Sequence, residues 1–221
     1  MSQVVLFGTG TIARMAYAYL THDSPHEIAA FTVDRDHMSG DQLFGLPVVP
    51  FEEVPSLYPP DEFDMFVAVG YALMNKFREQ KYHQAKTMGY RLISYVSSKA
   101  TIWSDYSSIG DNCFIMENNV IQPFVEIGSD IIMWSGNQVG HNSVIRDHCF
   151  VASHVVVSGN VTIEPNCFLG VNATIRDGIT IARECVIGAG ALILKDTEER
   201  QVYVGPKARL LPMPSNRISR L

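Results

Sequence analysis

Residues 127–163 read IGSDIIMWSGNQVGHNSVIRDHCFVASHVVVSGNVTI, and within this stretch an aliphatic residue or methionine recurs at every sixth position. The spacing continues without insertion on both sides and gives fifteen successive positions between residues 109 and 193. These positions are Ile109, Ile115, Ile121, Ile127, Met133, Val139, Ile145, Val151, Val157, Ile163, Leu169, Ile175, Ile181, Ile187 and Ile193. A chance run of aliphatic residues does not keep one spacing over such a length, so the repeat indicates a regular structure with a period of six residues.

A second position, four residues after the aliphatic one, is mostly small or apolar. It holds Cys113, Val125, Ser143, Cys149, Val155, Val161, Cys167, Ala173, Cys185 and Ala191. Glycine clusters one residue after the aliphatic position, at Gly110, Gly128, Gly140, Gly170 and Gly188. A helix repeats every 3.6 residues and a strand every two, so neither gives a period of six. A solenoid of short stacked strands does, because each unit buries its apolar side chain only against its neighbours.

We therefore expect a triangular prism in which each group of six residues forms one face and one corner. Three groups close a coil, so the fifteen groups make five coils, roughly 24 Å tall at the usual spacing between strands. The aliphatic position and the small residue four places later point into the prism. The remaining positions face outward.

The composition is that of an ordinary soluble globular protein of 221 residues, with 47% hydrophobic and 18% charged residues. A net charge of −6 argues against nucleic-acid binding, which needs clustered Lys and Arg. The longest apolar run, Met65–Met74, is half a membrane span. No signal peptide is recognisable, and the expected location is the cytoplasm. The four cysteines all fall on the small interior position, which predicts core filling rather than a disulfide or a zinc site.

The first hundred residues follow the order of a nucleotide-binding βαβ unit. A short apolar strand, Val4–Phe7, runs into Gly8-Thr9-Gly10, an amphipathic helix follows, and a second strand, Ile28–Val33, ends at Asp34. In such a unit the glycines let a phosphate approach the helix N-terminus, and the acid meets the ribose or base. Only about one hundred residues precede the repeat, so the length suits one nucleotide better than a dinucleotide.

Further elements of this region are a proline-rich loop over 38–60, a strand over 64–69, a helix over 74–88 capped by Gly89, and a strand over 92–96. We predict two domains: a Rossmann-like α/β domain over residues 1–100 and a β-helix with a C-terminal tail over residues 101–221. The fold class is thus a small βαβ domain followed by a left-handed parallel β-helix of hexapeptide repeats.

The chain resembles a bacterial family of left-handed β-helix sugar acetyltransferases, which includes the sialic acid O-acetyltransferase-like proteins and the UDP-bacillosamine-type N-acetyltransferases. The resemblance covers nearly the whole chain: the Gly8-Thr9-Gly10 turn, Asp34, the strand end Ala68-Val69-Gly70 and the prism. It implies a homotrimer, acetyl-CoA bound between adjacent prisms, and a nucleotide-linked sugar held by the N-terminal domain.

The family's catalytic histidine matches His141, in Val139-Gly140-His141-Asn142-Ser143. An imidazole with a pKa near 6.5 can take a proton at neutral pH and return it to a leaving thiolate. The family often has an acid after this histidine, where this chain has Asn142. Either Asn142 orients the ring, or Asp147 or Glu117 does. The resemblance also assigns to Gly159 the backbone N–H that stabilises the oxyanion.

The remaining site residues follow from the resemblance and from the βαβ unit. The predicted substrate-binding residues are Gly8, Thr9, Gly10, Asp34, Arg35, Gly70 and Trp134. Trp134 either stacks on the substrate or packs at the trimer interface. The predicted acetyl-CoA contacts are Gly159, Val171, Ala189 and Lys195, with Lys207 and Arg209 as further candidates for the CoA phosphates.

Three histidines, His141, His148 and His154, raise zinc as an alternative. His148 and His154 are six residues apart and therefore lie on adjacent faces, where they cannot converge on one metal. We therefore predict no metal. The expected function is acetyl-CoA-dependent N-acetylation of a UDP- or dTDP-linked amino sugar. The alternatives are sugar O-acetylation and, less strongly, a non-catalytic trimeric scaffold that binds a nucleotide.

Overall fold

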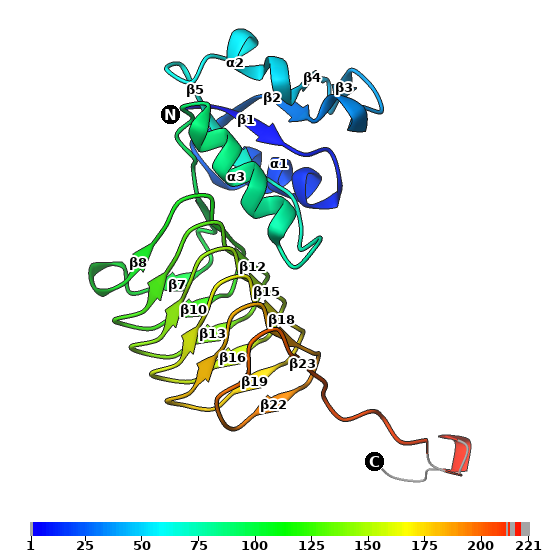
Figure 1. The fold of residues 1–221 in the computed structure, drawn as a ribbon, viewed down its shortest axis with the longest axis vertical. Helices are drawn as coiled ribbons and strands as arrows, with labels where there is room; N and C mark the ends of the chain where they lie inside the picture. The colour runs from blue at the N-terminus through cyan, green and yellow to red at the C-terminus, as the bar shows by residue number, and fades with distance from the viewer. Residues whose placement is uncertain (1, 211, 213–214, 218–221) are drawn as a thin grey trace.

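The computed structural model describes residues 2–210, 212 and 215–217. An α/β domain sits on one side of a long β-prism, and the tail leaves the far end of the prism (Figure 1). No helix in these described residues is long and apolar enough to cross a membrane.

The N-terminal domain is built on a five-stranded sheet in the order β3-β4-β2-β1-β5. Its strands are β1 (Gln3–Phe7), β2 (Glu27–Val33), β3 (Gln42–Leu43), β4 (Leu46–Pro50) and β5 (Phe63–Val67). The helices are α1 (Thr11–Asp23), α2 (Val54–Leu57) and α3 (Lys76–Thr87). All neighbouring strands are parallel except β3 and β4. The β1-α1-β2 unit is as predicted, whereas residues 38–60 are more ordered than predicted: they form a hairpin and a short helix.

The prism has three parallel sheets, and strands between Ser108 and Ile193 pair with the strand eighteen residues away, as in Val120↔Gln138. The domain-facing sheet contains β6 (Tyr95–Val96), β9 (Phe114–Ile115), β12 (Ile132–Met133), β15 (Phe150–Val151), β18 (Phe168–Leu169), β21 (Val186–Ile187) and β23 (Val202–Tyr203). The second sheet contains β7 (Thr101–Ile102), β10 (Val120–Ile121), β13 (Gln138–Val139), β16 (Val156–Val157), β19 (Thr174–Ile175) and β22 (Leu192–Ile193). The third contains β8 (Ser108–Ile109), β11 (Glu126–Ile127), β14 (Val144–Ile145), β17 (Thr162–Ile163) and β20 (Thr180–Ile181).

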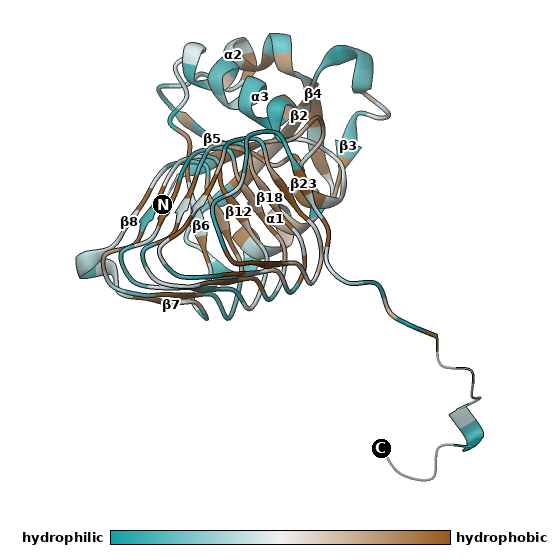
Figure 2. Cartoon of the chain, turned by 60° about the horizontal axis from the view of Figure 1, so that its bottom comes forward, coloured by the Kyte–Doolittle hydropathy of each residue, from teal (hydrophilic) through white to brown (hydrophobic). Residues whose placement is uncertain are grey.

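The interior of the prism follows the repeat. Fourteen of the fifteen aliphatic positions are buried, and Ile109 packs partly against the same core. The small residues four places later are buried too, including the four cysteines, which are all free thiols. In Figure 2 hydrophobic colour follows the strands and hydrophilic colour gathers at the corners. The predicted triangular solenoid is confirmed.

The prism extends beyond the predicted five coils. Tyr95–Val96 pairs with Phe114–Ile115 in the domain-facing sheet, so the predicted strand over 92–96 does not belong to the N-terminal sheet. The residues before Tyr95 pair with that sheet at one point, a parallel bridge between Leu92 and Met65 in which Met65 donates to the carbonyl of Arg91 and accepts from the N–H of Ile93. At the other end β23 adds one more strand to the domain-facing sheet. The division of the chain after residue 100 stays a prediction, with the first prism strand lying just before it.

The N-terminal domain covers the domain-facing sheet through aromatic packing. Phe114 meets Tyr19 edge-on at 5.6 Å, and Phe150 stacks on Phe168 at 5.4 Å. Tyr71 packs against Phe150 and Phe168, with ring centres 4.9 Å apart in both cases. Rings of this size bury large apolar areas and add directional contacts. The two domains are therefore held in one orientation.

Candidate active site

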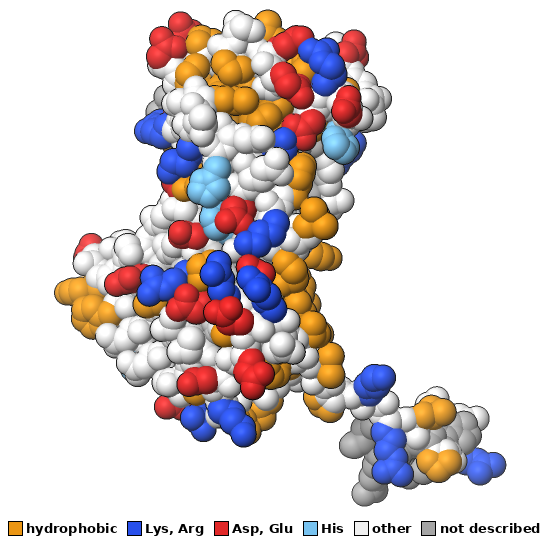
Figure 3. Space-filling model, viewed as in Figure 1, with side chains coloured by type: hydrophobic (Ala, Val, Ile, Leu, Met, Phe, Trp, Pro, Cys, Tyr) orange, Lys and Arg blue, Asp and Glu red, His pale blue; other side chains and the backbone are white. Residues whose placement is uncertain are grey.

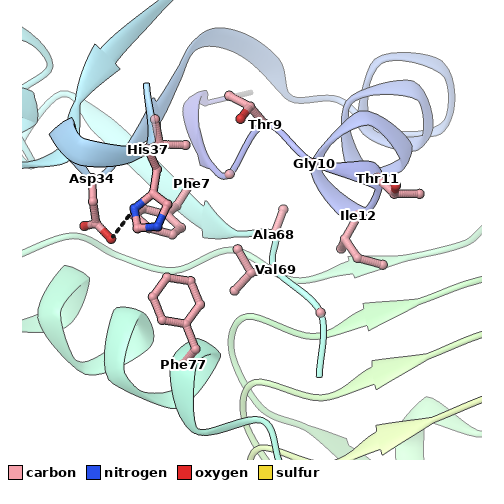
Figure 4. Close-up of a pocket in the computed structure, with 13 residues that line it drawn as sticks. Phe7, Thr9, Gly10, Thr11, Ile12, Asp34, His37, Ala68, Val69 and Phe77 are labelled. Atoms are coloured by element: carbon pink, nitrogen blue, oxygen red, sulfur yellow. Dashed lines mark ion pairs between the residues drawn. The ribbon is translucent and has the colours of Figure 1, made fainter. Parts of the chain in front are cut away.

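The predicted nucleotide residues line one cavity of about 280 Å³ at the carboxyl ends of β1, β2 and β5. Gly8, Thr9, Gly10, Asp34 and Gly70 all contribute to its wall. Ligands of open parallel sheets bind at this edge. Figure 4 shows His37 and Asp34 on one side of the cavity, Ile12 on the other, and Phe77 entering from α3.

The glycine turn packs so closely on its neighbours that a residue with a side chain does not fit at Gly8. The missing side chain leaves the cavity side of the turn open to a ligand. Gly8 has a φ of +117°, and a Cβ there would lie 2.8 Å from the carbonyl oxygen of Ala68. Gly8 also donates its N–H to Thr32 at 2.8 Å, which fixes the turn against β2. Gly10 is the N-cap of α1 and makes no side-chain cap. Thr11 and Ile12, the first residues of α1, line the cavity. A helix N-terminus at such a place favours an anion such as phosphate.

Asp34 is held by partners that the sequence did not suggest. Lys81 Nζ lies 2.5 Å from Asp34 Oδ1, and the Lys81 side chain is only 7% exposed. The lysine lies 5.2 to 5.5 Å from the ring centres of Phe7, Phe51 and Phe77. No sequence motif marks this lysine, because it lies within a helix that reads as polar. The other oxygen of this carboxylate, Oδ2, lies 4.0 Å from Nδ1 of His37 at the edge of the cavity (Figure 4).

Two predicted substrate residues do not line this cavity. The guanidinium of Arg35 pairs with Glu53, and its backbone N–H donates to Glu52 at 3.3 Å. Trp134 packs 6.4 Å from Phe150, in the apolar cluster between the two domains. Its indole N–H is buried without a hydrogen-bond partner. Within the described chain Trp134 thus serves packing between the domains, a role that the sequence did not suggest.

The second part of the candidate site is a prism corner between the second and third sheets, which we call the His141 corner. Residues eighteen apart stack there: Pro123, His141, Gly159, Asp177 and Lys195. The backbone continues this stack, because Asn160 donates to the carbonyl of His141 at 2.9 Å. The predicted base, oxyanion donor and phosphate-binding lysine therefore share one edge of the prism.

His141 is exposed, and its Nδ1 lies 3.0 Å from Asn142 Oδ1. A donated Nδ1–H in this contact leaves Nε2 unprotonated and free to act as a base. The acidic alternatives are engaged elsewhere. Asp147 accepts the Ser129 N–H at 2.7 Å, and Glu117 accepts hydroxyls from Tyr19 and Ser135, each at 2.7 Å. Within the chain, the contact to the ring is therefore that of Asn142.

Gly159 lies directly under the His141 ring. A Cβ at Gly159 would lie 2.8 Å from both Cε1 and Nε2 of the imidazole. A larger residue would displace the ring, so glycine is required for this arrangement. The N–H of Gly159 donates to no acceptor among the described residues, and it is therefore available to a ligand.

The predicted acetyl-CoA contacts flank the second sheet. Val171 is 44% exposed and stacks below Ala189 at the corner where the domain-facing and second sheets meet, with Gly190 donating to Val171 at 2.8 Å. Lys195 lies at the opposite edge of the second sheet. Between these edges the sheet exposes Val156 and Leu192. Lys207 and Arg209 lie on the exposed tail, away from this sheet.

Within one chain, the cavity and the His141 corner lie on opposite sides of the prism. The N-terminal domain covers the domain-facing sheet, whereas His141 lies where the other two sheets meet, at the opposite corner of the triangle. A nucleotide in the cavity therefore reaches its own His141 only by crossing the width of the prism.

Comparisons with known proteins agree with this architecture. Residues 160–195 match the hexapeptide repeat of succinyl-transferase. No curated protein matches the chain. PerB from Caulobacter crescentus, solved with CoA and GDP-perosamine, is 25% identical, with 93% of this chain and 95% of that chain covered and a TM-score of 0.82.

Two further structures share the fold. The acetyltransferase domain of PglB from Neisseria gonorrhoeae, solved with acetyl coenzyme A, is 24% identical over 95% of this chain and 98% of that chain, with a TM-score of 0.79. WeeI from Acinetobacter baumannii is 21% identical over 96% of this chain and 100% of that one, with a TM-score of 0.78. The chain thus carries a hexapeptide repeat and shares with these acetyltransferase structures the predicted fold, a left-handed β-helix preceded by an N-terminal α/β domain.

Proposed function

We propose that the protein transfers the acetyl group of acetyl-CoA to the amino group of a nucleotide-linked amino sugar. One observation carries the proposal: a glycine-turn nucleotide cavity and an imidazole over Gly159 occur in the same two-domain fold as PerB, whose structure holds CoA and GDP-perosamine. Neither feature alone would select this reaction.

The geometry suits direct transfer. The thioester would lie along the second sheet with its carbonyl at the Gly159 N–H, and the sugar amine would approach the His141 Nε2. The amine attacks the carbonyl carbon, a C–N bond forms, and His141 takes the proton from nitrogen. The carbonyl oxygen becomes an oxyanion that the Gly159 N–H stabilises. When the C–S bond breaks, the imidazolium returns the proton to the thiolate and restores the neutral ring.

An amine is favoured over a hydroxyl by the similarity to an N-acetyltransferase whose structure holds an amino-sugar nucleotide. A hydroxyl acceptor would use the same base and the same oxyanion donor, so O-acetylation remains the second candidate. An amine attacks more readily, because it is the stronger nucleophile and needs less help from a base. A neutral partner such as Asn142 is then sufficient for His141.

The active site is expected to be shared between copies of the chain. Because the cavity and His141 lie on opposite sides of one prism, the nucleotide of one chain would present its sugar to the His141 corner of the next. A closed ring with identical heterologous contacts satisfies every copy, and three copies match the triangular cross-section. We propose a homotrimer on this ground.

The experiment is an assay of free CoA with acetyl-CoA and a panel of UDP-, dTDP- and GDP-linked amino sugars, paired with the corresponding hydroxyl sugars. Release of CoA and an acetamido product with at least one amino sugar, and not with its hydroxyl counterpart, is expected. Acetylation of the hydroxyl sugar would establish the O-acetyltransferase. Nucleotide binding without any release of CoA would support the other alternative, a non-catalytic scaffold that binds a nucleotide.

A further inference from the structure

The prism has a second polar corner, between the third and the domain-facing sheets, which we call the docking corner. Its stacked residues are Asn112, Asp130, His148, Asn166 and Glu184. Each has a positive φ, between 53° and 62°. The helix α3 lies along this corner. Asn112 hydrogen-bonds to Val67 of β5, and the other four side chains contact residues of α3. In Figure 3 histidine and charged side chains gather at this waist between the two domains.

Three side chains at this junction point potential metal ligands toward one another: Glu79, His83 and His148. Glu79 and His83 are one turn apart on α3, and His148 comes from the prism. Their ligand atoms all lie within 4.8 Å of one another, and His148 Nε2 is 3.9 Å from Glu79 Oε1. This trio differs from His141, His148 and His154, which lie at three different corners and share no site.

The buried His148 is oriented for a cation. Its Nδ1 lies 2.8 Å from Oδ2 of the fully buried Asp130, and only 8% of its side chain is exposed. A carboxylate at Nδ1 accepts a hydrogen bond from the Nδ1–H and fixes the tautomer whose Nε2 carries a lone pair. Metal-bound histidines have this kind of partner, which also raises their basicity. The lone pair then faces a carboxylate oxygen, a repulsive arrangement unless a cation lies between them.

Asp130 and Glu79 are already partnered on their other sides. The Arg78 Nε lies 3.1 Å from Asp130 Oδ1, with both side chains fully buried. Asn166 donates to Glu79 Oε2 at 3.0 Å, and Lys76 lies 3.2 Å from the same oxygen. Both of these partners contact Oε2, so Oε1 of Glu79 faces the two imidazoles.

We propose that Glu79, His83 and His148 bind one divalent zinc ion that clamps α3 to the prism. Two imidazoles and a carboxylate are a zinc donor set, with a water as fourth ligand at the exposed side of His83. Zinc holds its ligands about 2.0–2.1 Å away, so tetrahedral ligand atoms lie about 3.4 Å apart. Rotation of the exposed His83 and a small closure of Glu79 would reach that spacing.

The ion would act as a staple rather than in acetyl transfer. It would lie on the corner between the third and domain-facing sheets, whereas His141 lies between the second and third. Because a ligand bound only by the native state raises stability, the metal would raise the melting temperature and fix the nucleotide cavity relative to the prism. The competing interpretation is a metal-free one, in which His148 only packs between Asp130 and Glu79.

The test uses the full-length protein without an affinity tag, stripped with a chelator and dialysed. Zn²⁺ alone is titrated by calorimetry, and the melting temperature is followed with and without Zn²⁺. His83→Ala removes one ligand at an exposed position, so the metal-free variant should melt like the wild type. His154→Ala is the matched control, because it removes an exposed histidine at another corner. Co²⁺ serves as a spectroscopic probe of tetrahedral coordination.

One zinc ion per chain, a higher melting temperature, and at least a tenfold loss of affinity in His83→Ala but not in His154→Ala are expected. Co²⁺ should give the intense visible bands of a tetrahedral site, and these should be lost in His83→Ala. No stoichiometric binding, or equal binding by wild type and His83→Ala, would overturn the proposal. These readouts involve no substrate, so they stand or fall independently of the acetyltransferase assay.

Discussion

The His141 corner and the docking corner are two edges of one prism with the same backbone and different surroundings. Both turn through residues of positive φ, with 59° at Asn142 and 62° at His148, and both carry a histidine. His141 is exposed, and its ring contacts one neutral amide. His148 is buried between a carboxylate and the helix α3. The backbone therefore fixes the direction of the side chain. The N-terminal domain, where it covers a corner, determines the chemical environment of that side chain.

The different surroundings suit the two histidines of one repeat to different proposed roles. A general base needs an open approach for the substrate and a free lone pair, which the His141 corner offers. The buried His148, with a carboxylate at its Nδ1, suits a structural contact or a bound cation instead.

The largest difference between the corners should appear in turnover. His141→Ala removes the base, so we expect a loss of about 10²–10⁴-fold in kcat with an unchanged melting temperature. His154→Ala, an exposed histidine at the third corner, should keep turnover within about threefold. Turnover of His141→Ala close to that of the wild type would remove His141 from the mechanism.

Substitutions at the docking corner should instead change the free energy of unfolding. Arg78 is fully buried, pairs with Asp130, and donates to the backbone carbonyls of His148 and Cys149 at 3.0 and 3.1 Å. Arg78→Met leaves a buried carboxylate without its cation, which should cost about 3–5 kcal/mol. Urea unfolding measures the loss, and Arg183→Met, at an exposed arginine, should change little.

Adding Asp130→Asn to Arg78→Met should recover part of the lost stability, because the uncompensated charge is gone. A double variant no more stable than Arg78→Met would indicate that the carbonyl contacts of Arg78, rather than its charge, hold the corner together.

A smaller effect is expected from Gly159→Ala. The added methyl would lie 2.8 Å from the His141 ring, so the imidazole must move. A displacement of about 1 Å can cost about 10²-fold in rate. The melting temperature should hold, since the corner is exposed. Normal kcat in Gly159→Ala would mean that the ring position in this structure is not the one used in catalysis.

The smallest expected effect concerns acid stability at the start of the prism. Hydrogen bonds from Ser98 and from the Tyr95 hydroxyl hold the pKa of Asp23 below its ordinary value. A depressed folded pKa stabilises the protein above the unfolded value, near 3.9, and this contribution is lost as pH falls below it. Asp23→Asn should therefore melt earlier than the wild type at pH 7, and the gap should shrink in acid. A gap that is constant with pH would assign the effect to packing.

The sequence predicts the prism well because one residue in six carries the information. An aliphatic side chain at each such position can be buried only by stacking, so the period alone gives the coils, the interior and the outward position of His141. The βαβ unit and the convergence of Gly8, Asp34 and Gly70 follow from local order in the same way. The hexapeptide match and the shared fold of PerB confirm the predicted resemblance.

The six-residue period does not show which faces of the prism the N-terminal domain covers. Asp130 and His148 read as ordinary polar corner residues, and nothing in the sequence shows that α3 inserts Arg78 beside them. For the same reason Arg35 and Trp134 were placed with the substrate, although one pairs with Glu53 and the other packs between the domains. Contacts between a periodic and an aperiodic domain depend on tertiary shape, which leaves no local pattern.

The most direct test of the shared active site combines two defective chains. Asp34→Ala should weaken sugar-nucleotide binding about 5- to 150-fold through a lost hydrogen bond, without changing acetyl-CoA affinity. His141→Ala removes the base. The two variants are co-expressed so that mixed trimers form, and CoA release is measured at a low sugar-nucleotide concentration. If the cavity of one chain serves His141 of the next, random mixing restores about one site in four. We expect recovery to about a quarter of wild-type activity. Activity no greater than the mean of the two single variants would contradict it.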